Sequence, residues 1–147
     1  MSGFTQDSFY PTLDDAWLSG FTQGDGGFKI YIVKRENTRS GYRIRLRYYL
    51  DQKDSKSELL YIKSLLAGGV VNSHSDENMF RYTIDSSNKL SIIKNYMIKN
   101  ILIGQKSIIF DKWAKALNLI ETKNHLSKEG FDNILKLKEE ILEITQN

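Results

Sequence analysis

The sequence predicts an α+β fold in which two pairs of antiparallel strands alternate with helices. Three observations support this prediction. Apolar and polar residues alternate over 28–34 and 42–50, which is the two-residue period of half-buried strands. Apolar residues recur every three or four positions over 59–66, 88–99, 106–119 and 127–142, which is the helical period. Glycines and polar clusters separate these stretches, so the predicted order is α-β-β-α-β-β-α with additional helices near the C-terminus.

Composition narrows the possible classes. Residues 1–147 suffice for one domain with a sizeable core. A net charge of +3 permits nucleic acid as a partner without requiring it, and the absence of cysteine excludes disulfides and thiolate metal sites. No apolar run reaches bilayer length and residues 1–7 lack a signal-peptide pattern, which predicts an intracellular protein that is neither membrane-bound nor secreted. The abundance of Ile, Lys and Asn fits an AT-rich genome, such as that of a mitochondrion or chloroplast.

The first predicted helix begins near Trp17 and ends within residues 24–27. Its bulky residues fall on one side, and Asp14 or Asp15 is placed to cap its start, because a short carboxylate accepts hydrogen bonds from the N–H groups of the first turn. The run of glycines that follows predicts the end of the helix, and a strand is expected to begin at Phe28.

Two glycines of this helix, Gly20 and Gly24, lie four residues apart and share a stripe without side chains. Such a stripe lets another backbone approach very closely. Asp25 follows at the C-terminal end of the helix, where the helix dipole disfavours a carboxylate. Either a tight Asp-Gly turn or a bound cation explains this residue, and on its own the turn is the simpler interpretation.

The two strands that follow read as a hairpin with one apolar and one basic face. Phe28, Ile30 and Ile32 share the apolar face with Ile44, Leu46, Tyr48 and Leu50. The opposite face carries Lys29, Tyr31, Val33, Arg35, Arg43, Arg45, Arg47 and Tyr49. Acidic residues on neighbouring strands would make this an ordinary solvated face, but the matching positions of the paired strand offer no acid. A basic β-ribbon suits the major groove of DNA, so we favour nucleic-acid binding.

The second half of the chain repeats the order helix, strand, strand, helix. Ser55 or Ser57 is placed to cap a helix that Gly68 and Gly69 end, and 70–74 and 79–84 form a second hairpin. Its residues Asn72, His74, Arg81 and Thr83 extend the polar face by parity. The later helices carry Leu90, Ile93 and Met97, then Ile109, Trp113 and Leu117, and, from Ser127 onward, Phe131, Ile134, Leu135, Lys138 and Leu142.

The segment 18–26, Leu-Ser-Gly-Phe-Thr-Gln-Gly-Asp-Gly, resembles the LAGLIDADG motif of the homing endonucleases. Ser19 and Gly24 replace alanines of the motif with small residues, and Gln23 stands where the family often has Asp. Two further segments resemble the family: Gln52-Lys53-Asp54 ahead of an amphipathic helix, and His-Leu-Ser-Lys-Glu-Gly-Phe at 125–131. The predicted element order is also that of a single LAGLIDADG domain, whose antiparallel sheet forms a DNA-binding saddle.

This resemblance implies a site-specific endonuclease that cleaves both strands of DNA. In the family pattern Asp25 is the metal-binding acid, with Gly24 beside it, and Gln52 stands where a polar residue orders water. Lys106 resembles the basic residue supplied just before a late helix. The simpler alternatives are a strand-end amide for Gln52 and a solvated lysine for Lys106. His74 and His125 fit structural or DNA-proximal roles better than catalysis.

One motif copy implies a homodimer, because family members with two copies act as monomers. The predicted interface is Trp17, Ser19, Gly20, Gln23 and Gly24. One Asp25 cannot hold Mg²⁺ against solvent, whereas two copies with DNA phosphate oxygens can complete its shell of six oxygens. The expected substrate is a long, near-palindromic double-stranded DNA. Two alternatives are an intron maturase that binds RNA with the same fold and a DNA-binding protein that has lost cleavage, although the retained Asp25 counts against the latter.

Overall fold

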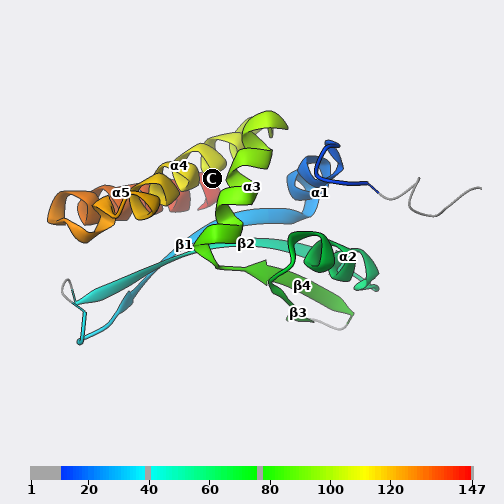
Figure 1. Cartoon of the computed structure of the whole chain (residues 1–147), viewed down its shortest axis with the longest axis horizontal. Coiled ribbons are helices and arrows are strands. Elements are labelled where there is room, and N and C mark those ends of the chain that lie inside the picture. The colour runs from blue at the N-terminus through cyan, green and yellow to red at the C-terminus, as the bar shows by residue number, and fades with distance from the viewer. Residues whose placement is uncertain (1–10, 39–40, 76–77, 147) are drawn as a thin grey trace, which may run out of the picture.

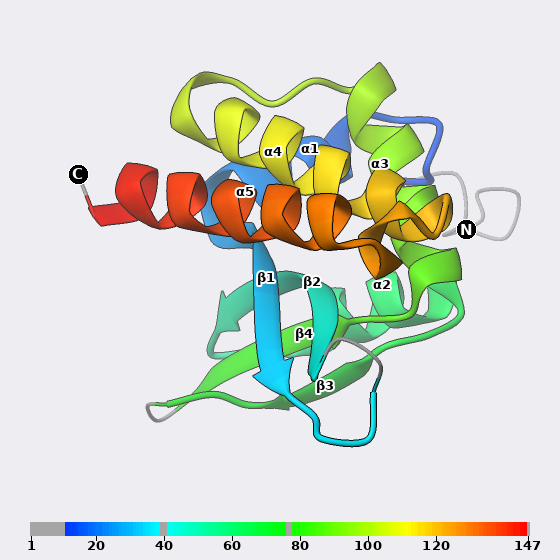
Figure 2. The same ribbon diagram turned by 90° about the vertical axis from the view of Figure 1, so that its left-hand side faces the viewer.

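The computed structural model describes residues 11–38, 41–75 and 78–146. A four-stranded antiparallel sheet is covered by helices on one face and left open on the other (Figure 1). The view from the side shows the strands fanning out below the helical layer (Figure 2). None of the helices in the described ranges is long and apolar enough to cross a membrane.

The observed element order confirms the predicted α-β-β-α-β-β-α arrangement with additional C-terminal helices. The elements are α1 Trp17–Asp25, β1 Gly26–Lys34, β2 Tyr42–Lys53, α2 Ser57–Leu66, β3 Val70–Ser73, β4 Met79–Ile84, α3 Ser87–Lys99, α4 Gly104–Glu121, the 3-10 turn η2 Asn124–Leu126, and α5 Lys128–Gln146. The strand order is β1-β2-β4-β3, so the two hairpins meet through β2 and β4. Residues 76 and 77 of the predicted turn, 39 and 40 of the predicted loop, and 1–7 lie outside the described ranges.

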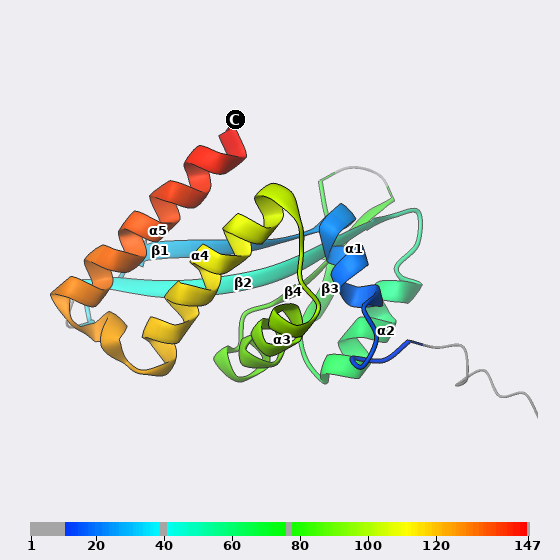
Figure 3. The same ribbon diagram turned by 90° about the horizontal axis from the view of Figure 1, so that it is seen from above.

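The core lies between the sheet and the helical layer. The predicted apolar face of the first hairpin faces this core, with all its residues buried except Ile32 and Ile44, which are half-buried. Phe28 of β1 packs its ring against Tyr48, Phe110 and Trp113 with centroids 5.5, 5.3 and 5.0 Å away. Burying one such side chain contributes roughly 1.5–3 kcal/mol, so this aromatic cluster is a main attachment of α4 to the sheet. Seen from above, α5 crosses obliquely over β1, the edge strand of the sheet (Figure 3).

Several local predictions differ from the structure. Neither Asp14 nor Asp15 caps α1, whose N-cap is Ala16, because the Asp15 carboxylate accepts from the Thr12 N–H at 3.1 Å instead. The helix continues through Asp25 and β1 begins at Gly26, two residues before the predicted start. A Cβ at Gly26 would lie 2.8 Å from the Leu50 side chain, so only glycine lets α1 pass directly into a strand this close to β2.

The other helix termini also show where local patterns succeed and fail. The Ser55 hydroxyl accepts from the Ser57 N–H at 3.2 Å, but the N-cap of α2 is Lys56, and the helix ends with Ala67 in the left-handed conformation, before the two glycines. In α5 the start near Ser127 is confirmed, since the Ser127 hydroxyl accepts from the Gly130 N–H at 3.0 Å. A Cβ at Gly130 would overlap the Asn124 carbonyl, which explains the glycine three residues after the serine.

The apolar stripe of α5 differs from the predicted one. Ile134 and Ile141 are buried, whereas Leu135 and Leu142 are 38% and 45% exposed. Neighbouring apolar positions at 134–135 and 141–142 make the stripe ambiguous in the sequence, and packing against α4 and β1 selects one residue of each pair.

Candidate active site and nucleic-acid interface

The motif helix α1 presents its two sides very differently. Leu18 and Thr22 are fully buried in the domain, whereas Gly20, Gly24 and Asp25 are exposed. A Cβ added at Gly20 or Gly24 would have no atom within 4 Å. The glycine stripe therefore faces away from its own domain, and the surface it leaves is open to another backbone.

Buried hydrogen bonds anchor α1 to the sheet and to α3. The Thr22 hydroxyl donates to the Leu18 carbonyl at 2.7 Å and lies 2.6 Å from the Tyr48 hydroxyl, whose pKa burial raises well above its ordinary value. The Tyr96 hydroxyl accepts from the Ser19 N–H at 3.1 Å and donates to the Asp15 carbonyl at 2.5 Å. The Tyr96 contacts hold the N-terminal end of α1, and the Thr22 contact holds the half that carries Asp25.

Lys106, in the first turn of α4, lies next to the C-terminal end of α1. Its ammonium donates to the carbonyl oxygens of Thr22, Gln23 and Gly26 at 3.0, 3.1 and 2.6 Å. These carbonyls lie at the C-terminal end of α1, where the helix dipole favours a cation, and the Thr22 carbonyl also accepts from the Gly26 N–H. Burial lowers the pKa of Lys106, and the charge of Asp25 opposes that shift. The structure thus brings the predicted lysine to the motif, where it stabilises the end of α1.

Asp25 and Gln52 share a pocket of about 390 Å³. Phe21, Asp51, Lys53, Glu58 and Met79 complete its lining. The Gln52 Oε1 atom is buried without a hydrogen-bond partner among the described residues, which is unusual for a buried polar atom. Hydrogen bonds from Ser57 and Gln52 lower the pKa of Glu58. The sequence-based prediction missed Glu58, for which the only local signal is an acid in the first turn of α2.

The oxygen donors at the end of α1 suit a hard cation. The Asp25 carboxylate is exposed and the Gly24 carbonyl belongs to the last helical turn, and both are oxygen ligands of the kind Mg²⁺ and Ca²⁺ prefer. Within 11–38, 41–75 and 78–146, however, no three His, Cys, Asp or Glu side chains gather into a group that could hold a metal ion.

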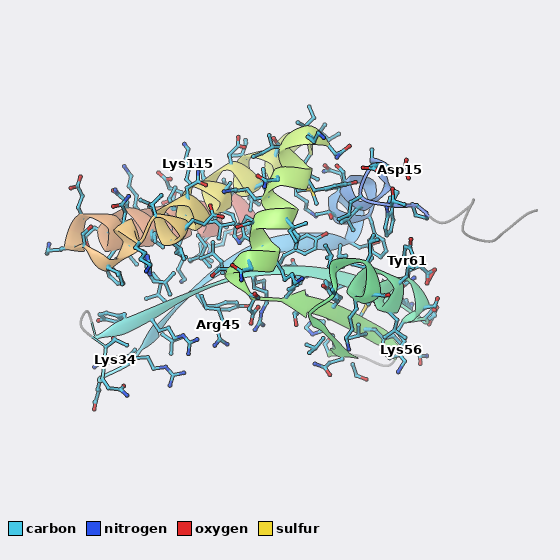
Figure 4. The ribbon with its side chains drawn as sticks, viewed as in Figure 1. Asp15, Lys34, Arg45, Lys56, Tyr61 and Lys115 are labelled. Carbon is cyan, nitrogen blue, oxygen red and sulfur yellow. The ribbon has the colours of Figure 1, made fainter. Side chains whose placement is uncertain are left out.

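The open face of the sheet carries the predicted polar residues. The strand register pairs Lys29 with Arg47, Tyr31 with Arg45, Val33 with Arg43, Tyr49 with Thr83, and Asn72 with Arg81, so these side chains share one face. Figure 4 shows Arg45 beneath the sheet, opposite the helical layer, and Lys34 near the far end of the β1–β2 hairpin. Arg35 lines a hollow of about 250 Å³ with arginines of β2, and His74 follows the end of β3.

The paired strand β1 offers these arginines no acid, as expected, but acids from elsewhere bind two arginines of this face. Arg47 donates through Nε and Nη2 to both carboxylate oxygens of Asp85 at 2.8 and 3.0 Å, and Arg81 binds Asp51 in the same way at 2.6 and 2.9 Å. The prediction considered only the strand paired with β2 on one side. Asp85 follows β4 on the other side, and Asp51 lies on β2 itself.

Three of the five predicted interface residues make contacts within their own chain. The Trp17 indole donates to the Thr12 carbonyl at 2.9 Å, Ser19 is buried, and the Gln23 amide bonds both the N–H and the carbonyl of Ile103 at 2.9 and 3.2 Å. Gly20 and Gly24 remain open, as predicted. Ile101 and Ile103 are 74% and 68% exposed beside α1, which extends the open surface with apolar side chains.

Sequence comparison finds a family and its relatives. The profile of the family described as LAGLIDADG endonuclease matches residues 18–117. Probable intron-encoded endonuclease 4 of Neurospora crassa is 34% identical over 136 residues, which cover 91% of this chain and 24% of that protein. The uncharacterized cox1 intron-2 37.2 kDa protein of Schizosaccharomyces pombe is 31% identical over 84% of this chain and 37% of its own length. The chain thus spans about a quarter to a little over a third of these relatives.

Structural comparison finds the same fold in solved proteins. The homing endonuclease I-TnaI superposes with a TM-score of 0.79 at 23% identity, over 92% of this chain and 95% of that one. The meganuclease I-SmaMI bound to uncleaveable DNA superposes with a TM-score of 0.78 at 28% identity, over 84% of this chain and 43% of its own. Another I-SmaMI structure, with uncleaved DNA target in the presence of calcium ions, gives 0.79 at 28% identity over 88% and 45%.

Proposed function

The chain belongs to the LAGLIDADG endonuclease family, and from this membership we propose that residues 1–147 form one domain of a homing endonuclease that cleaves both strands of a long, near-palindromic DNA. The observation that carries the proposal is the position of Asp25. Its carboxylate is exposed at the end of a helix whose bare stripe faces outward, at the edge of a basic sheet face. Cleavage and DNA binding then occupy adjoining surfaces of the same domain.

We propose that the working enzyme is a homodimer joined through α1. One chain supplies a single Asp25, and the match to DNA-bound I-SmaMI covers 84% of this chain but only 43% of that one. The exposed stripe of Gly20 and Gly24 lets two motif helices cross closely about a twofold axis, and the exposed Ile101 and Ile103 adjoin it. Such a crossing brings two Asp25 carboxylates together.

The chemistry follows from the donors that this pairing assembles. Asp25 and the Gly24 carbonyl from each chain would hold a divalent cation, for which Mg²⁺ is the proposed ion, and when bound it supplies an activated water and stabilises the leaving oxygen. Gln52 lines the Asp25 pocket, where its amide would orient water. Lys106 holds the end of α1 through three carbonyls, so the carboxylate stays in place during the reaction. Lysines and arginines of the open face neutralise phosphates.

A second candidate is RNA binding by the same face, as in an intron maturase. The relatives have names that refer to introns, which is the reason for this second candidate. A basic sheet face attracts either nucleic acid. Competition between labelled double-stranded DNA and an intron RNA for the purified protein distinguishes the two. We also propose residence in an organelle, which the Ile-, Lys- and Asn-rich composition supports.

Asp25→Asn tests the proposed cleavage. Asparagine keeps the size of the side chain but loses the charge that a hard cation needs. Removing a carboxylate from the negative end of a helix should leave folding intact. We expect the variant to bind its DNA site with wild-type affinity and to lose cleavage in Mg²⁺, whereas Asp111→Asn, an exposed change on α4, cleaves normally. Cleavage by purified Asp25→Asn at the wild-type rate would refute the assignment.

A further inference from the structure

Two side-chain clusters of the same composition lie on the open face of the sheet. In one, Asp85 binds Arg47, whose guanidinium carbon lies 5.2 Å from the centre of the Tyr31 ring. In the other, Asp51 binds Arg81, whose guanidinium carbon lies 4.1 Å from the centre of the Tyr49 ring. In both clusters the aspartate takes the Nε and Nη2 hydrogens, so the two arginines are held from the same side by the same kind of group.

The clusters occupy one region of the sheet. Tyr49 pairs with Gly27, two residues after Asp25, and Arg81 lies opposite Asp51, two residues further along β2. Arg43 and Arg45 instead lie toward the tip of the hairpin, where Val33 and Tyr31 are their partners in the register. The held arginines are thus near the end of the sheet that carries the motif, and the other arginines of β2 are farther from it.

An arginine that is bound to aspartate in this way can still donate hydrogen bonds to a ligand. A guanidinium has five N–H donors and the carboxylate takes two, so the outer edge remains available to a ligand. The side chains are 29% exposed for Arg47 and 18% for Arg81, so each is partly accessible. The hydrogen bond to aspartate is also the main cause that raises the pKa of each arginine.

The aspartates change what these arginines contribute to binding. Each carboxylate offsets the charge of its arginine, so the pair adds little to the general attraction for phosphates. The bond fixes the plane of the guanidinium, and a fixed edge with two parallel N–H groups matches the O6 and N7 acceptors of guanine in the major groove. A held arginine therefore suits recognition of a base, and a freely moving arginine suits phosphate contact.

We propose that Asp85 and Asp51 are positioning residues for base specificity, which hold Arg47 and Arg81 ready to bind guanine in the major groove. The proposal rests on the proposed function, because it assigns roles within the same DNA-binding face. Arg43 and Arg45 then serve mainly as phosphate contacts, since the nearest approach of Arg45 to Asp85 is a 3.8 Å ion pair without the two-bond geometry.

The test compares base preferences of the full-length wild type with those of Asp85→Asn and Asp51→Asn. Each protein selects from random double-stranded DNA in EDTA, so that bound DNA is recovered uncut, and the selected DNA is sequenced. We expect each variant to lose a preference for guanine, worth about fivefold to hundredfold, at one base pair for each bound domain. Affinity for unselected DNA should rise with a steeper salt dependence, because an unpaired arginine is released. Asp132→Asn, which removes an exposed partner of Lys128 on α5, should change neither property.

A second measurement separates positioning from simple neutralisation. If Asp85 acts through Arg47, then Arg47→Ala should lose the same guanine, and Asp85→Asn should have no further effect in that background. If the variants bind all DNA more tightly with every base preference unchanged, the proposal is refuted. Should an asparagine variant fail to fold, Asp85→Glu provides the same test, because it keeps the charge but displaces the guanidinium. A wild type that selects no DNA sequence would instead refute the proposed function itself.

Discussion

Replacing Lys106 by methionine should loosen the end of the motif helix. Methionine keeps much of the aliphatic length and removes the ammonium, which leaves the carbonyls of Thr22, Gln23 and Gly26 without the donor they share. Hydrogen bonds to charged groups contribute about 1.5–3 kcal/mol each. One ammonium makes all three and also loses hydration, so we expect a net loss of about 2–4 kcal/mol in the free energy of unfolding, or about 6–12 °C in melting temperature.

The pH dependence of the same variant provides an independent check. Burial lowers the pKa of Lys106 below its ordinary value of 10.5, so the unfolded chain binds more protons than the folded chain between the lowered pKa and 10.5. The free energy of unfolding of the wild type should therefore rise relative to Lys106→Met as pH increases through that window. Below the lowered pKa the difference between the two proteins should not vary with pH.

Urea unfolding followed by circular dichroism measures both effects. Lys115→Met is the matched control, because Lys115 is an exposed lysine of the same helix that points away from the sheet (Figure 4). DNA cleavage by Lys106→Met should fall at least tenfold under conditions in which the variant is folded, since Asp25 follows the loosened turn. A change of less than about 0.5 kcal/mol in stability, together with normal cleavage, would refute the role assigned to Lys106.

Further predictions concern packing and assembly. Gly130→Ala should cost about 1–3 kcal/mol in urea unfolding, because the new Cβ overlaps the Asn124 carbonyl, and an unchanged midpoint would contradict the described turn. Tyr48→Phe should cost about 1 kcal/mol by removing the buried contact with the Thr22 hydroxyl, and a gain in stability would show that the contact is unfavourable. Gly20→Leu should leave the single domain folded, because no atom lies within 4 Å of the added Cβ, but it should abolish self-association in sedimentation. Wild-type protein that sediments as a monomer while cleaving both strands would refute the homodimer.

Much of the fold was predictable because its signals are local. Alternation placed Phe28, Ile30 and Leu46 in the core, and the glycine spacing in 18–26 marked the bare stripe that α1 presents. The helix boundaries were less predictable. Asp15 has the right chemistry for a cap, but its carboxylate accepts a hydrogen bond from the Thr12 N–H, which precedes the helix.

Parts of the candidate site depended on contacts between distant segments. Glu58 joins the pocket of Asp25 and Gln52 only because α2 packs beside the end of β2. The acid that binds Arg47 was missed for the same reason, since Asp85 lies 38 residues away in the chain and not on the strand β1 that was compared.

The sequence by itself determined the element order, the buried and open faces of the strands, and the motif with Asp25 at its end. It did so because side-chain direction within a helix or strand follows from the spacing of residues along the chain. Only the tertiary structure decided which charges meet. Lys106 lies 84 residues from Thr22, whose carbonyl it binds. Asp51 meets Arg81 only because β2 and β4 pair in this register. Such contacts depend on how whole helices and strands are placed relative to one another. Packing of the shared core determines this placement, and no local sequence pattern encodes it.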